Sequence, residues 1–236
     1  MRVALVALVT LGIVSAAAPM GANPLLHLPS TVPPAERTVW ERLATTADVA
    51  TRVEAEPFLA RAAVFEYLLD HPAFATDVAR VLRLSKFTIR NTPSGMVLDD
   101  GRGLTGEFRL VYAANGTRLF HADGEYNAAL LPTIHGEALT MIEYRTRPAS
   151  QGRVFVAPAV SGFVRLDSRV LAFGFRVLHA AAQRKAALEA QRLMKKFARV
   201  SRALEESPEA VLEKLRQAPG VSTRELDEFG RLLSAR

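Results

Sequence analysis

The chain has 236 residues, of which 49% are hydrophobic and 23% are charged, a composition typical of a globular protein with an ample core. It contains no cysteine, which excludes disulfides, zinc–thiolate sites and cysteine nucleophiles. The formal net charge of +6 fits an anionic membrane surface or a nucleic-acid partner, although many soluble proteins are equally basic.

Residues 1–18 have the pattern of a secretory signal peptide. Arg2 supplies a positive charge, residues 3–14 form an apolar run, and the small residues 15–18 suit cleavage. The run is shorter than the roughly 20 residues of a membrane-spanning helix. We therefore expect export across the inner membrane to the periplasm. The alternative is that this segment is retained as an anchor or a buried helix.

Residues 19–46 read as a proline-rich lead-in that ends in a short helix, because proline is tolerated in a first helical turn. Alternation over residues 47–56 predicts a strand that Pro57 ends. A helix over residues 58–69 is expected next. The residue before Pro72 disfavours helical geometry, so a second helix should begin near residue 73 and reach residue 82.

A series of strands separated by turns follows. The most regular, residues 104–112, is expected to place Leu104, Phe108, Leu110 and Tyr112 on one face. Asn115-Gly116 favours a tight hairpin turn. Short connections between consecutive strands indicate an antiparallel meander. The expected strands cover residues 86–91, 96–98, 104–112, 117–126, 139–147 and 153–157.

The longest helical pattern covers residues 166–204, without proline and with Gly174 as its only glycine. Its first half, residues 170–182, is apolar nearly all round, and its second half is strongly basic. Residues 209–217 and 224–233 then predict two short helices, which form a C-terminal hairpin within residues 206–236.

This order of elements resembles the START-like, helix-grip (SRPBCC-type) family. The resemblance lies in residues 51–57, which match its first strand and proline, in residues 63–72, which match its first helix, and in residues 163–167 before the long helix. It implies an α+β fold over residues 47–205, in which a curved antiparallel sheet wraps around a long C-terminal helix. The space between them usually holds a lipid or another hydrophobic ligand.

Apolar and aromatic side chains are the usual lining of such pockets, although each one taken singly fits plain core packing equally well. The residues expected to form the wall are Phe108, Tyr112, Tyr126, Met141, Phe155, Phe173 and Val177.

The basic half of the long helix fits either a solvated face or contact with an anionic membrane, where each Lys or Arg contributes about 1 kcal/mol. Nucleic acid is disfavoured, because aromatic side chains for base stacking are not interleaved with these charges. The expected membrane contacts are Arg184, Lys185, Arg192, Lys195, Lys196 and Arg199.

Signals for catalysis are weak. The histidines lack the paired spacing of metal ligands, so we expect no metal and no cofactor. The serine elbow and the glycine-rich phosphate loop are also absent from the sequence. An enzyme of this fold would need polar groups in its cavity, and the candidates are Tyr112, Tyr126, His121 and Glu143.

Together these patterns predict an exported, monomeric, non-enzymatic protein that binds or transfers a lipid or another hydrophobic small molecule. Two alternatives stay open. One is a cyclase- or hydrolase-like enzyme that acts on a hydrophobic substrate in the same cavity. The other is a structural or assembly factor of the envelope that docks through the C-terminal hairpin.

Overall fold

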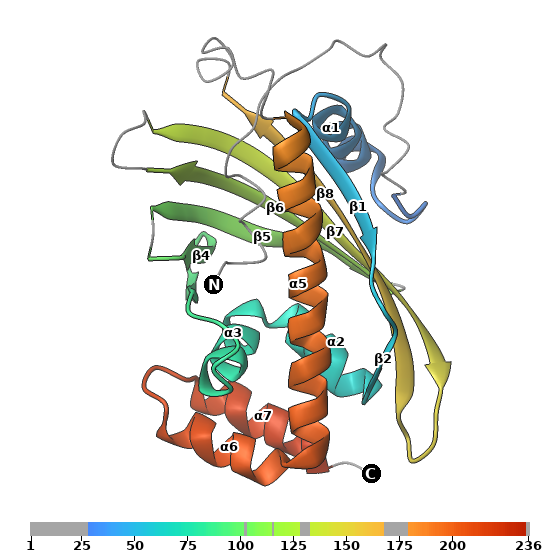
Figure 1. Ribbon diagram of the computed structural model, residues 1–236, viewed down its shortest axis with the longest axis vertical. Helices are drawn as coiled ribbons and strands as arrows, with labels where there is room; N and C mark the ends of the chain where they lie inside the picture. Colours follow the sequence, from blue (N-terminus) through green and yellow to red (C-terminus); the bar gives the residue numbers. More distant parts are fainter. Residues whose placement is uncertain (1–27, 102, 115, 128–132, 168–178, 235–236) are drawn as a thin grey trace.

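The computed structural model describes residues 28–101, 103–114, 116–127, 133–167 and 179–234. Within these ranges a curved sheet is crossed on one side by a long helix, α5 (Figure 1). The elements are, in chain order, α1 (Pro34–Thr45), β1 (Val49–Glu54), β2 (Phe58–Ala60), α2 (Ala62–Asp70), α3 (Pro72–Val81), β3 (Thr88–Thr92), β4 (Gly95–Asp99), β5 (Leu104–Ala114), β6 (Thr117–Tyr126), β7 (Ile134–Pro148), β8 (Val154–Leu166), α5 (His179–Glu206), α6 (Pro208–Gln217) and α7 (Thr223–Ser234).

All strand pairs are antiparallel, in the order β1-β8-β7-β6-β5-β4-β3, and β2 also pairs with β8. The first strand therefore lies beside the last, and the meander β3 to β8 forms the rest of the sheet. With α5 across its concave side, this is a helix-grip arrangement. The predicted α+β class, the antiparallel meander and the long C-terminal helix are confirmed.

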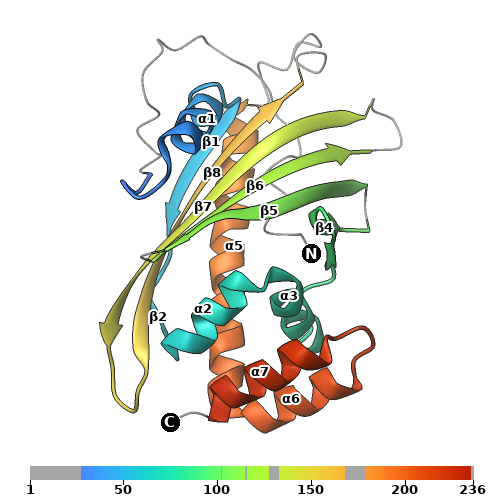
Figure 2. The same ribbon diagram turned by 180° about the vertical axis from the view of Figure 1, so that it is seen from behind.

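The two faces of the sheet differ in what covers them. In β7, Ala138 and Ile142 belong to the core that includes α5, whereas Leu139 and Met141 pack under α1. We call the side toward α5 the inner face and the side toward α1 the outer face; α1 lies in front of the sheet in Figure 2. None of the described helices combines the length and the apolar character needed to cross a bilayer.

The predicted end of the last strand at residue 157 is wrong, because β8 continues to Leu166, the residue near which the long helix was expected to begin. The sequence appeared to break at Pro158, which cannot donate a hydrogen bond within a sheet. Its carbonyl accepts from the Ala55 N–H at 3.0 Å, so its nitrogen faces the gap between β1 and β2. A ladder bond is not required there, and the strand continues. Most of the predicted apolar half, residues 170–182, lies outside the described residues.

The helix expected over residues 58–69 begins only at Ala62. Before it, β2 pairs with β8 through Phe58↔Val156 and Ala60↔Val154. The apolar residues 58–60 suited a helical face locally, but pairing with β8 determines their conformation. Local propensity is a weak guide where tertiary pairing is available.

The predicted common face of β5 fails at Tyr112. Leu110 pairs with Phe120, but Tyr112 pairs with Leu119, so one residue of β5 is extra at this point. Such a bulge reverses the side to which the following side chains point. Phe108 therefore lies on the inner face and Tyr112 on the outer face, where its hydroxyl lies 2.5 Å from the Thr31 hydroxyl oxygen.

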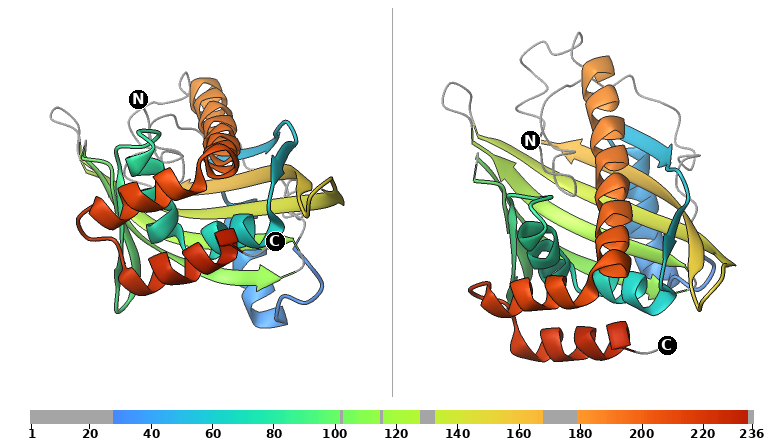
Figure 3. Two further views of the ribbon diagram at one scale, coloured as in Figure 1. Left: turned by 90° about the horizontal axis from the view of Figure 1, so that it is seen from below. Right: turned by 60° about the horizontal axis from the view of Figure 1, so that its bottom comes forward.

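The predicted C-terminal hairpin is confirmed, and it shares a core with the first helix pair. Phe74 of α3 packs edge-on against Phe229 of α7, with ring centroids 5.0 Å apart. Val64 of α2, Leu204 of α5 and Leu215 of α6 belong to the same cluster. Figure 3 shows α6 and α7 side by side across one end of the molecule, next to α2 and α3. This second core fixes the lower half of α5.

Candidate functional site

An apolar cavity lies between the inner face of the sheet, the helices α2 and α3, and α5. Its volume is about 70 Å³. The sheet lines one side of the cavity and α5 lines the opposite side, as expected for a helix-grip fold. The lining residues are Leu68, Leu69, Pro72, Ala75, Thr76, Ala79, Ser85, Phe87, Ile89, Phe120, Ile142, Leu193, Lys196, Phe197 and Val200.

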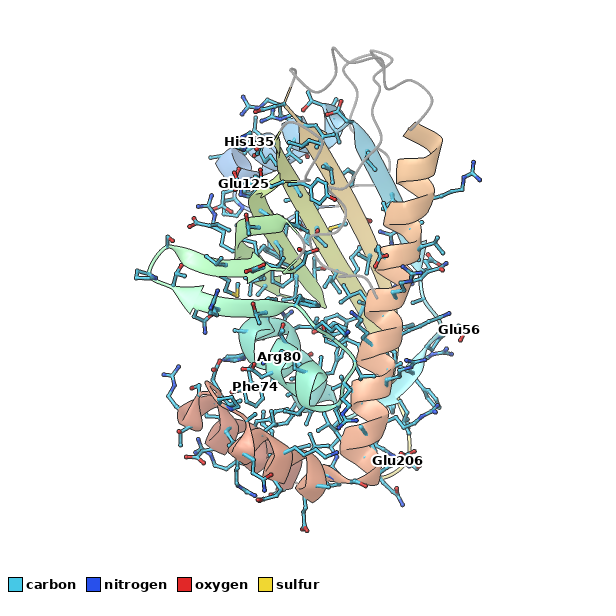
Figure 4. The ribbon with its side chains drawn as sticks, turned by 60° about the vertical axis from the view of Figure 1, so that its left-hand side comes forward. Glu56, Phe74, Arg80, Glu125, His135 and Glu206 are labelled. Carbon is cyan, nitrogen blue, oxygen red and sulfur yellow. The ribbon has the colours of Figure 1, made fainter. Side chains whose placement is uncertain are left out.

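The sequence of each element explains why these side chains converge. On α5, Leu193, Lys196 and Val200 recur at helical spacing and so share one face. On the sheet, Phe120 and Ile142 occupy inner-face positions of β6 and β7. Figure 4 shows α3 between the sheet and the C-terminal hairpin, where it closes the remaining side.

Three polar residues interrupt this apolar lining, and one of them, Thr76, is satisfied because its hydroxyl donates to the Pro72 carbonyl at 2.8 Å. Lys196 is half-buried, and its Nζ lies 5.4 Å from the centroid of the Phe87 ring, within range of a cation–π contact. Burial lowers the pKa of Lys196 below its ordinary value of 10.5. The negative charge of Glu189 partly opposes this change in pKa, and the positive charge of Arg192 adds to it. Ser85 Oγ is buried and has no hydrogen-bond partner among the described residues.

The seven residues predicted to form a ligand wall do not meet in this cavity. Phe108 and Tyr126 lie on the inner face, but neither lines it. Tyr112 and Met141 face α1, because the bulge turns the first and strand alternation places the second on the outer face. Phe155 is 47% exposed near the tip of the β7–β8 hairpin. Phe173 and Val177 lie outside the described residues.

Of the six basic residues predicted to contact a membrane, Arg184, Arg192, Lys195 and Arg199 are exposed on α5. Arg192 also pairs with Glu189 one turn earlier. The side chain of Lys185 is outside the description. Lys196 differs from the others, because it turns inward and lines the apolar cavity. Its spacing from Leu193 and Val200 was the sequence signal that would have separated it from the basic face.

The four groups considered for catalysis are also separated. Glu143 lies on the outer face and forms an ion pair with Arg52. His121 lies on that face too, under Trp40, with ring centroids 5.0 Å apart. Tyr112 is on the outer face as well, whereas Tyr126 packs against the inner core. They therefore do not converge on one substrate.

A larger, polar hollow occupies the outer face at the other end of the sheet. We call it the outer trough; its volume is about 600 Å³. Glu125 and His135, labelled in Figure 4, lie at this end. It is lined by Val97, Thr105, Gly106, Glu107, Asp123, Gly124, Glu125, His135, Gly136, Glu137, Arg165, Leu166 and Asp167.

At one side of the outer trough, ligand atoms of His121, Asp123 and Glu137 lie within 4.8 Å of one another, a spacing that suits a cation. Both carboxylate oxygens of Glu137 are already engaged, however. Oε1 lies 2.8 Å from His121 Nε2, and Oε2 accepts from Arg165. A metal ion would have to displace His121 or Arg165 from Glu137. The three side chains therefore already satisfy one another by hydrogen bonds and ion pairs.

Comparisons with known proteins identify only loosely similar folds. No family model matches the chain, and the search of curated proteins found no relative. Similar solved structures include a hypothetical protein from Helicobacter pylori (11% identity, 66% of this chain and 89% of that one, TM-score 0.39). They also include a conserved protein from Geobacillus kaustophilus (10% identity, 65% and 93%, TM-score 0.39).

A truncated norcoclaurine synthase from Thalictrum flavum is similar at 13% identity, over 61% of this chain and 93% of that one, with a TM-score of 0.31. All three TM-scores lie below 0.5. The helix-grip assignment therefore rests on the strand order and on the position of α5 against the inner face.

Proposed function

We propose that this protein is an exported binding or transfer protein for a hydrophobic ligand, which it holds between the inner face of the sheet and α5. The observation that carries the proposal is the apolar cavity. Its fifteen lining residues are all apolar except Thr76, Ser85 and Lys196. Burial of apolar ligand surface against such a lining is favourable at roughly 25 cal/mol per Å².

The size of the apolar cavity restricts the ligand. Its volume of about 70 Å³ is small beside the roughly 300–1,000 Å³ of pockets that enclose drug-sized molecules. The cavity therefore suits a short apolar chain or one buried end of a longer molecule.

The outward face of α5 supports delivery to and from a membrane. Arg184, Lys195, Arg199 and Arg202 are exposed there at intervals of three, four or more residues. Near an anionic bilayer each such charge contributes about 1 kcal/mol. Flotation with phosphatidylglycerol vesicles tests this contact, and the variant K195E/R199E should float less than the wild type. Equal flotation would remove the proposed role of α5.

Ligand binding is tested by isothermal titration calorimetry with 1-octanol, a short neutral probe. The variant A79L fills the cavity from α3, since Ala79 is buried and lines it. We expect at least about tenfold weaker octanol binding, equal to a loss of about 1.4 kcal/mol. Ala210 on the exposed side of α6 provides the control variant A210L. Unchanged binding to A79L would contradict the proposal.

Export is tested separately by N-terminal sequencing of protein recovered from the envelope fraction. A mature chain that begins near residue 19 supports a cleaved signal peptide. Recovery of the intact N-terminus with the soluble cytoplasmic fraction would contradict it.

A further inference from the structure

We infer that the ligand of the apolar cavity is a short amphiphile with a single carboxylate, which Lys196 and Ser85 hold while its apolar chain lies against Phe120, Ile142 and Leu193. This inference rests on the proposed function and adds the chemical class of the ligand. It starts from Lys196 and Ser85, since the third polar residue of the lining, Thr76, already donates its hydroxyl to the Pro72 carbonyl.

Lys196 is a cation that no carboxylate reaches as an ion-pair partner among the described residues, although the charge of Glu189 acts on it from the same helix. Its Nζ lies 5.4 Å from the centroid of the Phe87 ring, and both residues line the cavity. Glu189 is buried seven residues earlier on α5. Its Oε1 accepts from Arg192, and its Oε2 has no hydrogen-bond partner among the described residues, so Glu189 does not bond to Lys196. A half-buried ammonium in apolar surroundings is unfavourable unless an anion accompanies it.

Ser85 supplies the second donor. Its Oγ is buried and has no partner within the described residues, and a buried hydroxyl left unsatisfied costs free energy. The backbone here is held by α3, since the N–H groups of Leu84 and Ser85 donate to the Ala79 carbonyl at 2.7 and 3.3 Å. The hydroxyl itself can rotate to donate to a ligand oxygen.

These two donors fit a carboxylate better than other head groups. A carboxylate has two acceptor oxygens and one negative charge, so one can accept from the ammonium and the other from the hydroxyl. A phosphate would bring more charge and more acceptors than one ammonium and one hydroxyl satisfy. A neutral alcohol would leave Lys196 without its counter-charge.

The experiment compares octanoate with 1-octanol by isothermal titration calorimetry, because the two probes share chain length and differ in charge. We expect the wild type to bind octanoate at least about tenfold more tightly than octanol, as hydrogen bonds to charged groups allow. K196M should abolish this preference while it retains octanol binding. S85A should weaken octanoate binding severalfold.

The neighbouring Lys195 is exposed on the same helix and gives the matched control K195M, which should keep the full preference. K196Q serves as a second variant, and thermal melts establish that each variant is folded. Equal affinity of the wild type for both probes would overturn this inference and leave the proposed function intact. Loss of the preference in K195M as well would also overturn it, and binding of neither probe would overturn both proposals.

Discussion

The two faces of strands β5 to β8 differ sharply in polarity: the inner face is apolar and buried, and the outer face carries a row of charged residues. On the inner face Phe108, Ala122, Ala138 and Val164 lie side by side in register, in the core that α5 closes. One residue along each strand, the outer face carries the row Glu107, Asp123, Glu137 and Arg165.

The outer trough and the apolar cavity differ in size and in how far their polar groups are already paired. The outer trough is the larger, at about 600 Å³ against about 70 Å³, but both carboxylate oxygens of its central residue Glu137 are already engaged by His121 and Arg165. The apolar cavity is small, yet within the described part of the chain its Ser85 hydroxyl has no hydrogen-bond partner and its Lys196 forms no ion pair. Unsatisfied groups indicate a ligand more directly than volume does.

The largest expected effect is on the inner side. Phe65 is 1% exposed and packs against Phe58, Tyr144 and Phe197, with ring centroids 5.0–5.7 Å apart. F65A should lower the free energy of unfolding by about 3–5 kcal/mol, because it removes a buried aromatic ring and leaves a void. Urea denaturation measures this. F155A, at an exposed position, should change stability by less than about 0.5 kcal/mol, and a comparable loss in both variants would contradict the assignment of faces.

A smaller effect is expected where a charge enters the inner face. The buried Arg118 donates to Asp70 of α2 at 3.0 Å, and its guanidinium lies 5.9 Å from the Tyr144 ring centroid. R118M should destabilise the protein by about 2 kcal/mol. This loss is smaller than that expected from breaking a fully buried ion pair, because Asp70 is partly exposed. A double-mutant cycle with D70N measures the coupling. A coupling energy near zero would show that the pair does not hold α2 to the sheet.

The third prediction concerns stability and pH at Lys196. Its folded-state pKa is lowered by burial, so between that value and 10.5 the unfolded state binds more protons than the folded state. The free energy of unfolding contributed by this group therefore rises with pH in that window. At pH 7, where burial disfavours the charged form, K196M should be more stable by less than about 1 kcal/mol, because solvent screens the partly exposed ammonium. Urea unfolding of both proteins from pH 7 to 10.5 tests this, and a K196M protein less stable than the wild type at pH 7 would contradict it.

The smallest effect is expected in the outer trough. Glu107 and Asp123 are paired across β5 and β6, and like charges directly opposite each other are unfavourable. E107Q should stabilise the protein by a few tenths of a kcal/mol at low salt, and the gain should vanish at about 0.5 M salt because of screening. Thermal melts at both salt concentrations measure this. A destabilisation above 1 kcal/mol would mean that the row is held by a bound cation.

Much of the fold follows from local signals in the sequence. The two-residue connection between Ala114 and Thr117 follows from Asn115-Gly116, and Gly116 has a φ of +74°. The caps and prolines around α6 and α7 located both helices to within a residue or two. These signals act over a few residues, so they can be read without knowledge of tertiary contacts.

The site was harder to predict, because it is assembled from distant segments. Ser85, Phe120 and Lys196 meet only after the sheet has curved around α5. The bulge that turns Tyr112 outward has no local sequence signal, and one extra residue reversed its predicted face. Lys196 was also misplaced, since we predicted a membrane contact, although its helical spacing from Leu193 was a local signal for an inward position.

The second core has a consequence for the order in which the chain can fold. It joins Val64 of α2 to Leu233 of α7, so it cannot be completed until nearly the whole described chain is present. Contacts of such long sequence separation form slowly, because a large loop must close first. During synthesis, α2 and α3 would therefore emerge long before the helices that cover them. For the export proposed above, such a delay would keep the chain unfolded until it has crossed the membrane.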